Sequence, residues 1–395
     1  MSAPDKSMQV ESSTVVASVT SQGKVSLASL ALVGFGPFML LLMPVFVGAV
    51  SRELGFSTRE LGYLASAELA GLTLVSVLAG LWLGRFTTRN LAIAGVALMA
   101  AANFACILTT TVPAFIACRL LAGIGGGTLL ALGTALIATF PKPDRLYAFA
   151  IALQVSSAAI GLYLLPGVFE RAGIDSGLVV IGLVPLMLLP LIAWLPTGRP
   201  RAQSPRLFGH RRNTAAVQIL ASTLVFSLGV GGVWAYVEQM GTAQGLGTKF
   251  LSSALAGAMV VSFIGALFAS WLEARVGRRI PLLIGILGQS AGLLLLGGEL
   301  SEPVFLASVL AFNFFWSFVG PYQLGALSGV DCSGEYAALL PGFQGVGFAA
   351  GPAIAAEILV RSGYQVLTFM GIACLLASLA LILPRARAAA AQQRS

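Results

Sequence analysis

The chain has 395 residues, of which 57% are hydrophobic and only 10% are charged, and its formal net charge is +8. So few charged residues cannot cover the surface of a water-soluble protein of this length, which excludes an ordinary soluble enzyme or binding module. With a mean hydropathy of +0.91, the composition indicates an integral membrane protein.

Apolar stretches long enough for membrane-spanning helices recur along the chain, and we predict twelve of them. A polar, Pro- and Arg-rich segment at 196–213 separates a half at 28–195 from a half at 214–384, and tails at 1–27 and 385–395 flank the two halves. The predicted fold class is an all-α membrane protein with two pseudo-symmetric six-helix bundles. In chain order, the predicted helices lie at about 28–50, 59–83, 91–110, 112–140, 146–167, 176–195, 214–238, 249–273, 281–298, 303–326, 337–360 and 364–384.

The basic residues are distributed unevenly over these segments. If the N-terminus is cytoplasmic, most of the 23 Lys and Arg residues fall in cytoplasmic tails and loops. This positive-inside bias predicts a multi-pass protein of the inner cell membrane with both termini in the cytoplasm. A nucleic-acid-binding face is the alternative, but no base-stacking module accompanies the charge. The lipid bilayer is therefore an expected partner, nucleic acid is not, and we expect a monomer.

The fourth predicted helix contains one charge, Arg119, inside a long apolar run. A charge there costs about 2.5–3.5 kcal/mol on insertion scales, so it needs a partner or a wet cavity. Gly123 and Gly127 leave one helix face bare, which allows a neighbouring helix to approach closely. Glu68, on the second predicted helix, lies at a matching depth of roughly 10–14 Å. The two residues form a candidate proton-coupling pair. The alternatives are a permanent structural ion pair and a Glu68 that faces a polar pocket without titrating.

Two acids near the outer ends of predicted helices have a simpler expected role. Glu238 ends the seventh predicted helix and Glu357 lies near the outer end of the eleventh. We expect both to be solvated helix-end acids at the membrane surface.

The loops after the second and eighth predicted helices are both basic and carry similar residue types at corresponding positions. Trp82 and Arg89 in the first correspond to Trp271 and Arg278 in the second. Twelve spans in two halves with these loops resemble the major facilitator superfamily over nearly the whole chain, although Gly84 replaces the Asp of its loop signature. We interpret the loops as charge latches that meet helix-end carbonyl groups and acids across the halves. The candidate latch residues are Gly80, Arg85, Arg89, Glu273, Arg275, Gly277, Arg278 and Arg279.

Two glycine motifs in the predicted helices concern how transport would be driven. Arg119, Gly123 and Gly125 match a helix 4 pattern of this superfamily that is associated with proton-coupled members. Gly351 and Pro352 belong to a Gly-x-x-x-Gly-Pro run in helix 11, a motif that antiporters of the superfamily carry in helix 5. The resemblance implies a secondary transporter, not an enzyme, that needs no cofactor and is driven by the proton gradient.

Aromatic side chains indicate the substrate site. The resemblance implies that helices 1, 4, 7 and 10 line the cavity, where aromatic rings with a few amide and phenol groups would form an apolar site. Lipid-facing or packing roles are the alternative for each residue. The candidates are Phe35, Phe38, Met39, Met43, Trp234, Tyr236, Asn313, Trp316, Tyr322 and Gln323.

Three functions remain open. The first is alternating-access export of a small apolar or aromatic compound, coupled to protons through Glu68 and Arg119. The second is proton-coupled uptake of a small organic monoanion, with Arg119 as the carboxylate anchor. The third is a membrane-embedded enzyme or receptor, although no nucleophile, base and orienting residue converge. With one histidine, His210, and scattered cysteines, we expect no metal site.

Overall fold

The computed structural model describes residues 22–109, 111–200, 213–331 and 335–392. Within these ranges the chain forms helices and turns and contains no strand. The side chains of Glu273 and Arg275 and most of the predicted linker lie outside the described part.

The helices fall into two groups along the chain. The first group is residues 22–35, α2 (Phe38–Leu54), α3 (Thr58–Val77), α4 (Ala79–Trp82), η1 (Leu83–Arg85), α5 (Thr88–Leu108), α6 (Val112–Ile137), α7 (Pro143–Leu186) and α8 (Leu189–Ile192). The second group is α9 (Thr214–Ala243), α10 (Thr248–Val276), α11 (Arg279–Leu296), α12 (Glu302–Ser328), η2 (Ala337–Leu339) and α13 (Leu340–Gln392).

The number of membrane spans follows from helix length and two glycine breaks. Nine helices in the described part are apolar and long enough to cross a membrane, or ten if the bent pair α3 and α4 is one span. Two of them, α7 and α13, have 44 and 53 residues, whereas one crossing needs about 20. Each is interrupted at a glycine with positive φ, Gly173 (75°) in α7 and Gly363 (77°) in α13, a conformation that favours glycine. Counted as two spans each, they complete the predicted twelve.

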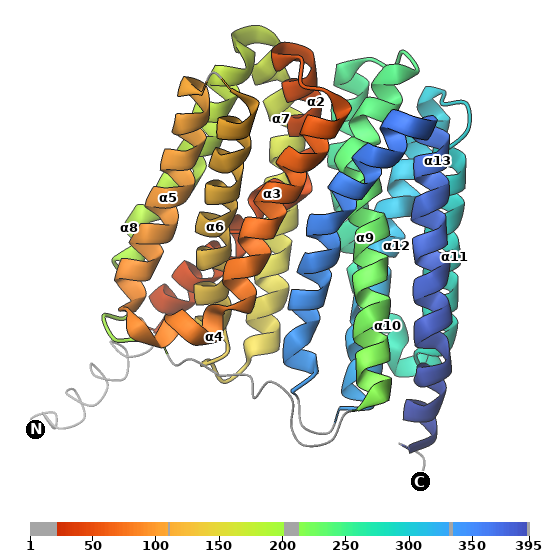
Figure 1. Ribbon diagram of the computed structural model, residues 1–395. Helices are drawn as coiled ribbons and strands as arrows, with labels where there is room; N and C mark the ends of the chain where they lie inside the picture. The colour runs from red at the N-terminus through yellow and green to blue at the C-terminus, as the bar shows by residue number, and fades with distance from the viewer. Residues whose placement is uncertain (1–21, 110, 201–212, 332–334, 393–395) are drawn as a thin grey trace, which may run out of the picture.

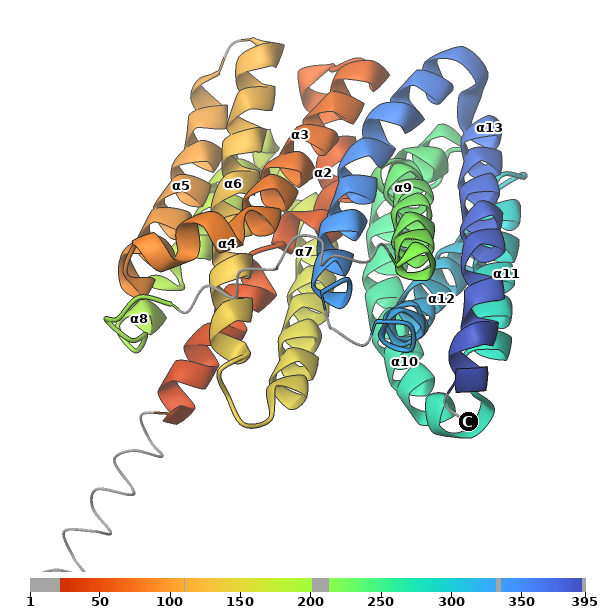
Figure 2. The same cartoon turned by 60° about the horizontal axis from the view of Figure 1, so that its bottom comes forward.

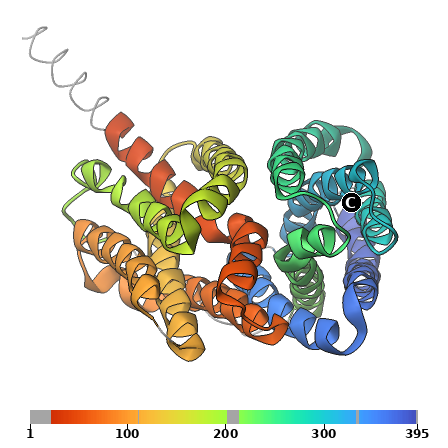
Figure 3. The same ribbon diagram turned by 90° about the horizontal axis from the view of Figure 1, so that it is seen from above.

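The two groups of helices form two bundles that lie side by side, which is clearest in the view from above (Figure 3). The start of the first helix and the end of α13 lie at the same end of the molecule (Figures 1 and 2). The halves are in extensive contact along α3 with α13, α7 with α10, and α2 with α9. Their fourth spans, α6 and α12, make no comparable contact with each other in the described ranges.

Bare glycine faces allow α6 to pack closely against its neighbours. A Cβ atom on Gly123 or Gly127 would collide with the backbone carbonyl of Glu68 or Leu72 in α3. On another side of α6, a Cβ on Gly125 would lie 2.7 Å from the carbonyl oxygen of Gly95 in α5. The predicted close approach is therefore confirmed, and it brings α3, α5 and α6 together around Arg119.

Candidate transport site

Arg119 and Glu68 face each other inside the first bundle. Arg119 on α6 is completely buried, and Glu68 on α3 is 3% exposed. The Arg119 Nη1 atom lies 3.8 Å from Glu68 Oε2. Because α3 and α6 touch at Gly123, directly beside the Glu68 backbone, the two side chains meet without spanning a gap. The structure thus brings together the two residues of the predicted pair. They form an ion pair that is buried away from water.

Asn103 on α5 completes this cluster. Arg119 Nη2 donates a hydrogen bond to Asn103 Oδ1 at 2.8 Å. The Asn103 Nδ2 group donates to the carbonyl of Met99 at 2.7 Å, which orients the amide with its oxygen toward the guanidinium. Sequence reasoning did not assign Asn103 a role. The signal was available, since it is the one strongly polar residue in an otherwise apolar predicted helix.

The guanidinium retains unused donors. Two aromatic rings enclose it, because its Cζ lies 5.3 Å from the ring centre of Phe46 and 5.9 Å from that of Phe115, within cation–π range. In the part of the chain that the structure describes, neither Nε nor Nη1 of Arg119 has a hydrogen-bond partner, nor has Glu68 Oε2. A planar guanidinium with free donors can bind a carboxylate through two hydrogen bonds.

An aromatic cluster occupies the second bundle. Trp234 on α9 stacks on Phe312 at 6.4 Å between ring centres and meets Trp316 edge-on at 5.9 Å. Phe348 on α13 lies 5.7 Å from Trp316. These four residues, which we call the aromatic cluster, come from three helices. Offset and edge-to-face contacts at these distances are favourable for aromatic rings, and a ring-shaped ligand can extend them.

The other candidate substrate residues lie in both bundles. Tyr322 turns away from the cluster, because its hydroxyl donates to the carbonyl of Ala269 on α10 at 3.0 Å. Asn313 and Gln323 are fully buried. Among the described residues, Asn313 Oδ1 and both polar atoms of the Gln323 amide find no hydrogen-bond partner. On the first bundle, Phe38, Met39 and Met43 are buried and Phe35 is partly buried.

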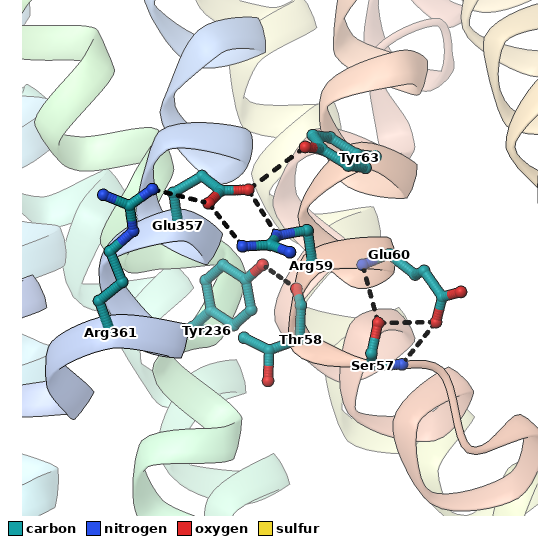
Figure 4. Close-up of polar contacts among 8 residues, drawn as sticks. All are labelled: Ser57, Thr58, Arg59, Glu60, Tyr63, Tyr236, Glu357 and Arg361. Carbon is teal, nitrogen blue, oxygen red and sulfur yellow. Dashed lines mark hydrogen bonds and ion pairs between the residues drawn. The ribbon is translucent and has the colours of Figure 1, made fainter.

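Two ion pairs that sequence reasoning missed join the bundles at the end opposite the termini. Arg52 on α2 donates from Nη1 to Glu238 Oε1 on α9 at 2.6 Å. Arg59 on α3 binds both oxygens of Glu357 on α13, at 2.7 and 2.9 Å (Figure 4). The expectation that Glu238 is solvated is wrong, since its side chain is 2% exposed; the packing of α9 on α2 removes it from water. Glu357 is 34% exposed and ion-paired.

Tyrosine hydroxyls add to this end of the interface. Tyr236, a candidate substrate residue, donates to the carbonyl of Thr58 on α3 at 3.0 Å, and Tyr63 reaches Glu357 at 3.3 Å (Figure 4). A capping box between Ser57 and Glu60 fixes the start of α3. The cap therefore sets the position from which α3 contacts the other bundle.

The sequence as a whole matches a known family. The family model of the Major Facilitator Superfamily matches residues 27–330. The chain belongs to the Major Facilitator Superfamily. The predicted family and fold class are confirmed, and the protein is a membrane transporter of this superfamily.

Three proteins of known function are similar in sequence. The chain is 25% identical over 350 residues to the 3-(3-hydroxy-phenyl)propionate transporter of Escherichia coli strain K12, covering 78% of this chain and 86% of that transporter. It is 27% identical over 153 residues to the 4-hydroxybenzoate transporter PcaK of Pseudomonas putida, covering 38% and 34%. It is 28% identical over 168 residues to the gallate transporter of Pseudomonas putida, covering 41% and 36%.

Solved structures of the superfamily share the fold. The xylose transporter XylE of Escherichia coli, in an inward-open conformation, superposes with a TM-score of 0.71 at 17% identity, covering 90% of this chain and 94% of that one. A D-xylose-proton symporter superposes with a TM-score of 0.72 at 18% identity, covering 90% and 96%.

The superfamily loop after the second span binds carbonyl groups within its own half. Arg89 donates from Nε to the carbonyl of Leu195 and from Nη2 to that of Ala193, both at 2.7 Å. Arg85 ends η1 and is exposed, and Gly80 lies in α4. In the second loop Gly277 has a φ of 70°, Arg278 precedes α11 and Arg279 begins it. Among the described residues, Arg89 therefore binds helix-end carbonyl groups of its own half, and a latch across the halves stays a prediction.

Proposed function

We propose that this protein carries a small aromatic carboxylate and a proton together across the inner membrane by alternating access. The observation that carries the proposal is the aromatic cluster of Trp234, Phe312, Trp316 and Phe348. A planar ring can stack on such a cluster without requiring many hydrogen bonds. The three similar transporters are named for 3-(3-hydroxy-phenyl)propionate, 4-hydroxybenzoate and gallate, each of which combines an aromatic ring with a carboxylate.

The negative charge of such a substrate needs a cation, and Arg119 supplies one. It is the one Lys or Arg that is fully buried among the residues whose side chains are described. Its Nε and Nη1 donors have no hydrogen-bond partner among the described residues, so they remain available to a second carboxylate. This reasoning favours uptake of an organic monoanion over export of a neutral compound, the other function that the sequence left open.

Glu68 would couple proton binding to anion binding because its carboxylate and the substrate carboxylate compete for Arg119. While Glu68 is ionised, it holds Arg119 at 3.8 Å and reduces the attraction of the guanidinium for another anion. A proton on Glu68 removes this competitor, and the substrate carboxylate takes its place. One proton and one monoanion carry no net charge, so the loaded transporter changes conformation without moving charge across the membrane.

The contacts between the bundles suggest which side is closed. Ion pairs and tyrosine hydrogen bonds join the halves at the end opposite the termini, and α6 and α12 lack an extensive contact in the described ranges. With the termini in the cytoplasm, this arrangement is closed to the outside. Separation of these contacts would open the outward-facing state.

Transport by purified protein in lipid vesicles tests the proposal. The substrates are 3-(3-hydroxyphenyl)propionate, 4-hydroxybenzoate and gallate, with 4-hydroxybenzyl alcohol as a neutral aromatic control and hexanoate as a non-aromatic carboxylate. We expect uptake of at least one aromatic acid, stimulated when the outside is acidic, and little transport of either control. Equal transport of the neutral alcohol, or stimulation by an alkaline outside, would contradict the proposal.

A further inference from the structure

The carbonyl of Leu40 on α2 lacks the donor that an α-helix normally supplies. Its hydrogen bond would come from the N–H group four residues later, but residue 44 is proline, which has none. Helix α2 is buried over most of its length. A carbonyl in such a position must find another donor, because an unsatisfied buried polar group is costly.

Trp234 of the opposite bundle provides that donor. Its indole Nε1 donates to the Leu40 carbonyl at 3.2 Å, and the residue is 1% exposed. The same indole ring belongs to the aromatic cluster, where it contacts Phe312 and Trp316. One side chain therefore takes part both in the contact between the bundles and in the wall of the proposed substrate site.

Further contacts continue from this hydrogen bond along the line where α2 packs against α9, which we call the seam. Glu238, one turn after Trp234 on α9, packs against Gly48 of α2 and binds Arg52, one turn after Gly48. Residues 40, 44, 48 and 52 follow each other at intervals of one turn. The seam between α2 and α9 thus runs from the Leu40 carbonyl to the end opposite the termini.

We propose that Trp234 is a positioning residue that links the substrate site to closure of this seam. Separation of α2 from α9 leaves the Leu40 carbonyl without its donor, so the hydrogen bond favours the closed seam. A ring stacked on the aromatic cluster holds the indole in the orientation that the hydrogen bond requires. This second step rests on the proposed function, whereas the first does not.

A double-mutant cycle in the full-length protein tests the link without substrate. Trp234→Phe keeps a ring but removes the N–H group, and Pro44→Ala supplies an N–H group to the Leu40 carbonyl within α2. Spin labels on Arg171→Cys and Lys249→Cys, in a background lacking the 4 native cysteines, report the ratio of closed to open seam in lipid nanodiscs. Both label sites are exposed, one in each half.

The two substitutions should not act independently. We expect Trp234→Phe to lower the closed-to-open ratio by roughly 5- to 30-fold when residue 44 is proline, and by less than about 2-fold when it is alanine. Trp82→Phe is the matched control, since the Trp82 indole donates to the carbonyl of Val75 within one half. It should leave the ratio unchanged. An unchanged ratio in Trp234→Phe, or an equal effect in both backgrounds, would overturn the proposal.

Added ligand tests the step that depends on the substrate site. An aromatic carboxylate that the vesicle assay identifies as a substrate should raise the closed-to-open ratio in the wild type several-fold, and less in Trp234→Phe. An equal rise in both proteins would remove the link between site and seam. If none of the aromatic acids is transported, the proposed function fails, while the substrate-free cycle still decides the role of the hydrogen bond.

Discussion

The guanidinium of Arg119 lies 3.8 Å from the Glu68 carboxylate. Within the described ranges, neither of the two nearest atoms, Nη1 and Oε2, makes a hydrogen bond. The attraction between the residues is therefore electrostatic and lacks the close geometry of a bidentate pair. Burial strengthens such an attraction because little water screens it. A contact of this kind holds the residues together but leaves the guanidinium able to turn toward another carboxylate.

Glu68→Gln should separate substrate exchange from proton coupling. Glutamine resembles the protonated acid, so Arg119 stays available to the substrate while no proton is bound or released. We expect exchange of labelled for unlabelled substrate to persist, with a rate that no longer varies with pH between about 5 and 8. Exchange with the wild-type dependence on pH would contradict the role of Glu68.

Asn103→Ala should destabilise the first bundle. It removes the acceptor of the Arg119 Nη2 hydrogen bond, and an unsatisfied buried donor costs about 1–3 kcal/mol, or more when charged. Thermal unfolding in detergent measures the loss as a lower midpoint temperature. Thr128→Ala is the control on α6, because the Thr128 hydroxyl donates to the carbonyl of Ile124 in the same helix. An equal midpoint in the two variants would mean that Asn103 does not support the guanidinium.

Gly123→Ala should force α3 and α6 apart. A Cβ on Gly123 would overlap the backbone carbonyl of Glu68, which a rotamer change cannot relieve, and overpacking typically costs about 1–3 kcal/mol. We expect lower thermal stability and slower transport. At Gly257, a Cβ would meet no atom of the described residues within 4 Å, so Gly257→Ala should behave as the wild type. Similar behaviour of the two variants would show that close packing of α3 on α6 is unimportant.

The number of spans and the depth of charged residues could be predicted because both follow from distance along a helix. The length of apolar stretches predicted twelve spans, and counting from the helix ends placed Glu68 at the same depth as Arg119. The direction in which a residue points around its helix axis is set by tertiary packing, and one sequence leaves it open. For this reason the sequence could not reveal that Tyr322 bonds within its own half or that Glu238 is buried against Gly48.

Contacts between the halves were the hardest to predict. Arg52 and Glu238 are 186 residues apart in sequence, and no local pattern connects them. A useful signal was present, since Arg52 and Arg59 flank the loop between the first two predicted helices, and Glu238 and Glu357 are acids near the outer ends of helices. Opposite charges at the same depth suggest ion pairs, but the partners depend on which helices of the two bundles meet.

Arg52→Ala should weaken closure of the α2–α9 seam more than Arg59→Ala does. Glu238 is almost completely buried, and losing a hydrogen bond to a charged group costs about 1.5–3 kcal/mol. Because Arg52 is 33% exposed, we expect an effect near the lower limit of this energy range. The Arg59–Glu357 pair is more exposed and should contribute less, with an effect that falls at high salt. Spin-label distances between Arg171→Cys and Lys249→Cys provide the comparison, and a larger effect of Arg59→Ala would contradict this order.

Competition between Glu68 and a substrate carboxylate for Arg119 is tested most directly by proton-driven accumulation in vesicles. The internal concentration of a transported aromatic acid is measured with the outside acidic, for the wild type and for Glu68→Gln. We predict that the wild type accumulates the acid above its external concentration, whereas Glu68→Gln only equilibrates it. Accumulation by Glu68→Gln to the wild-type level would contradict the mechanism.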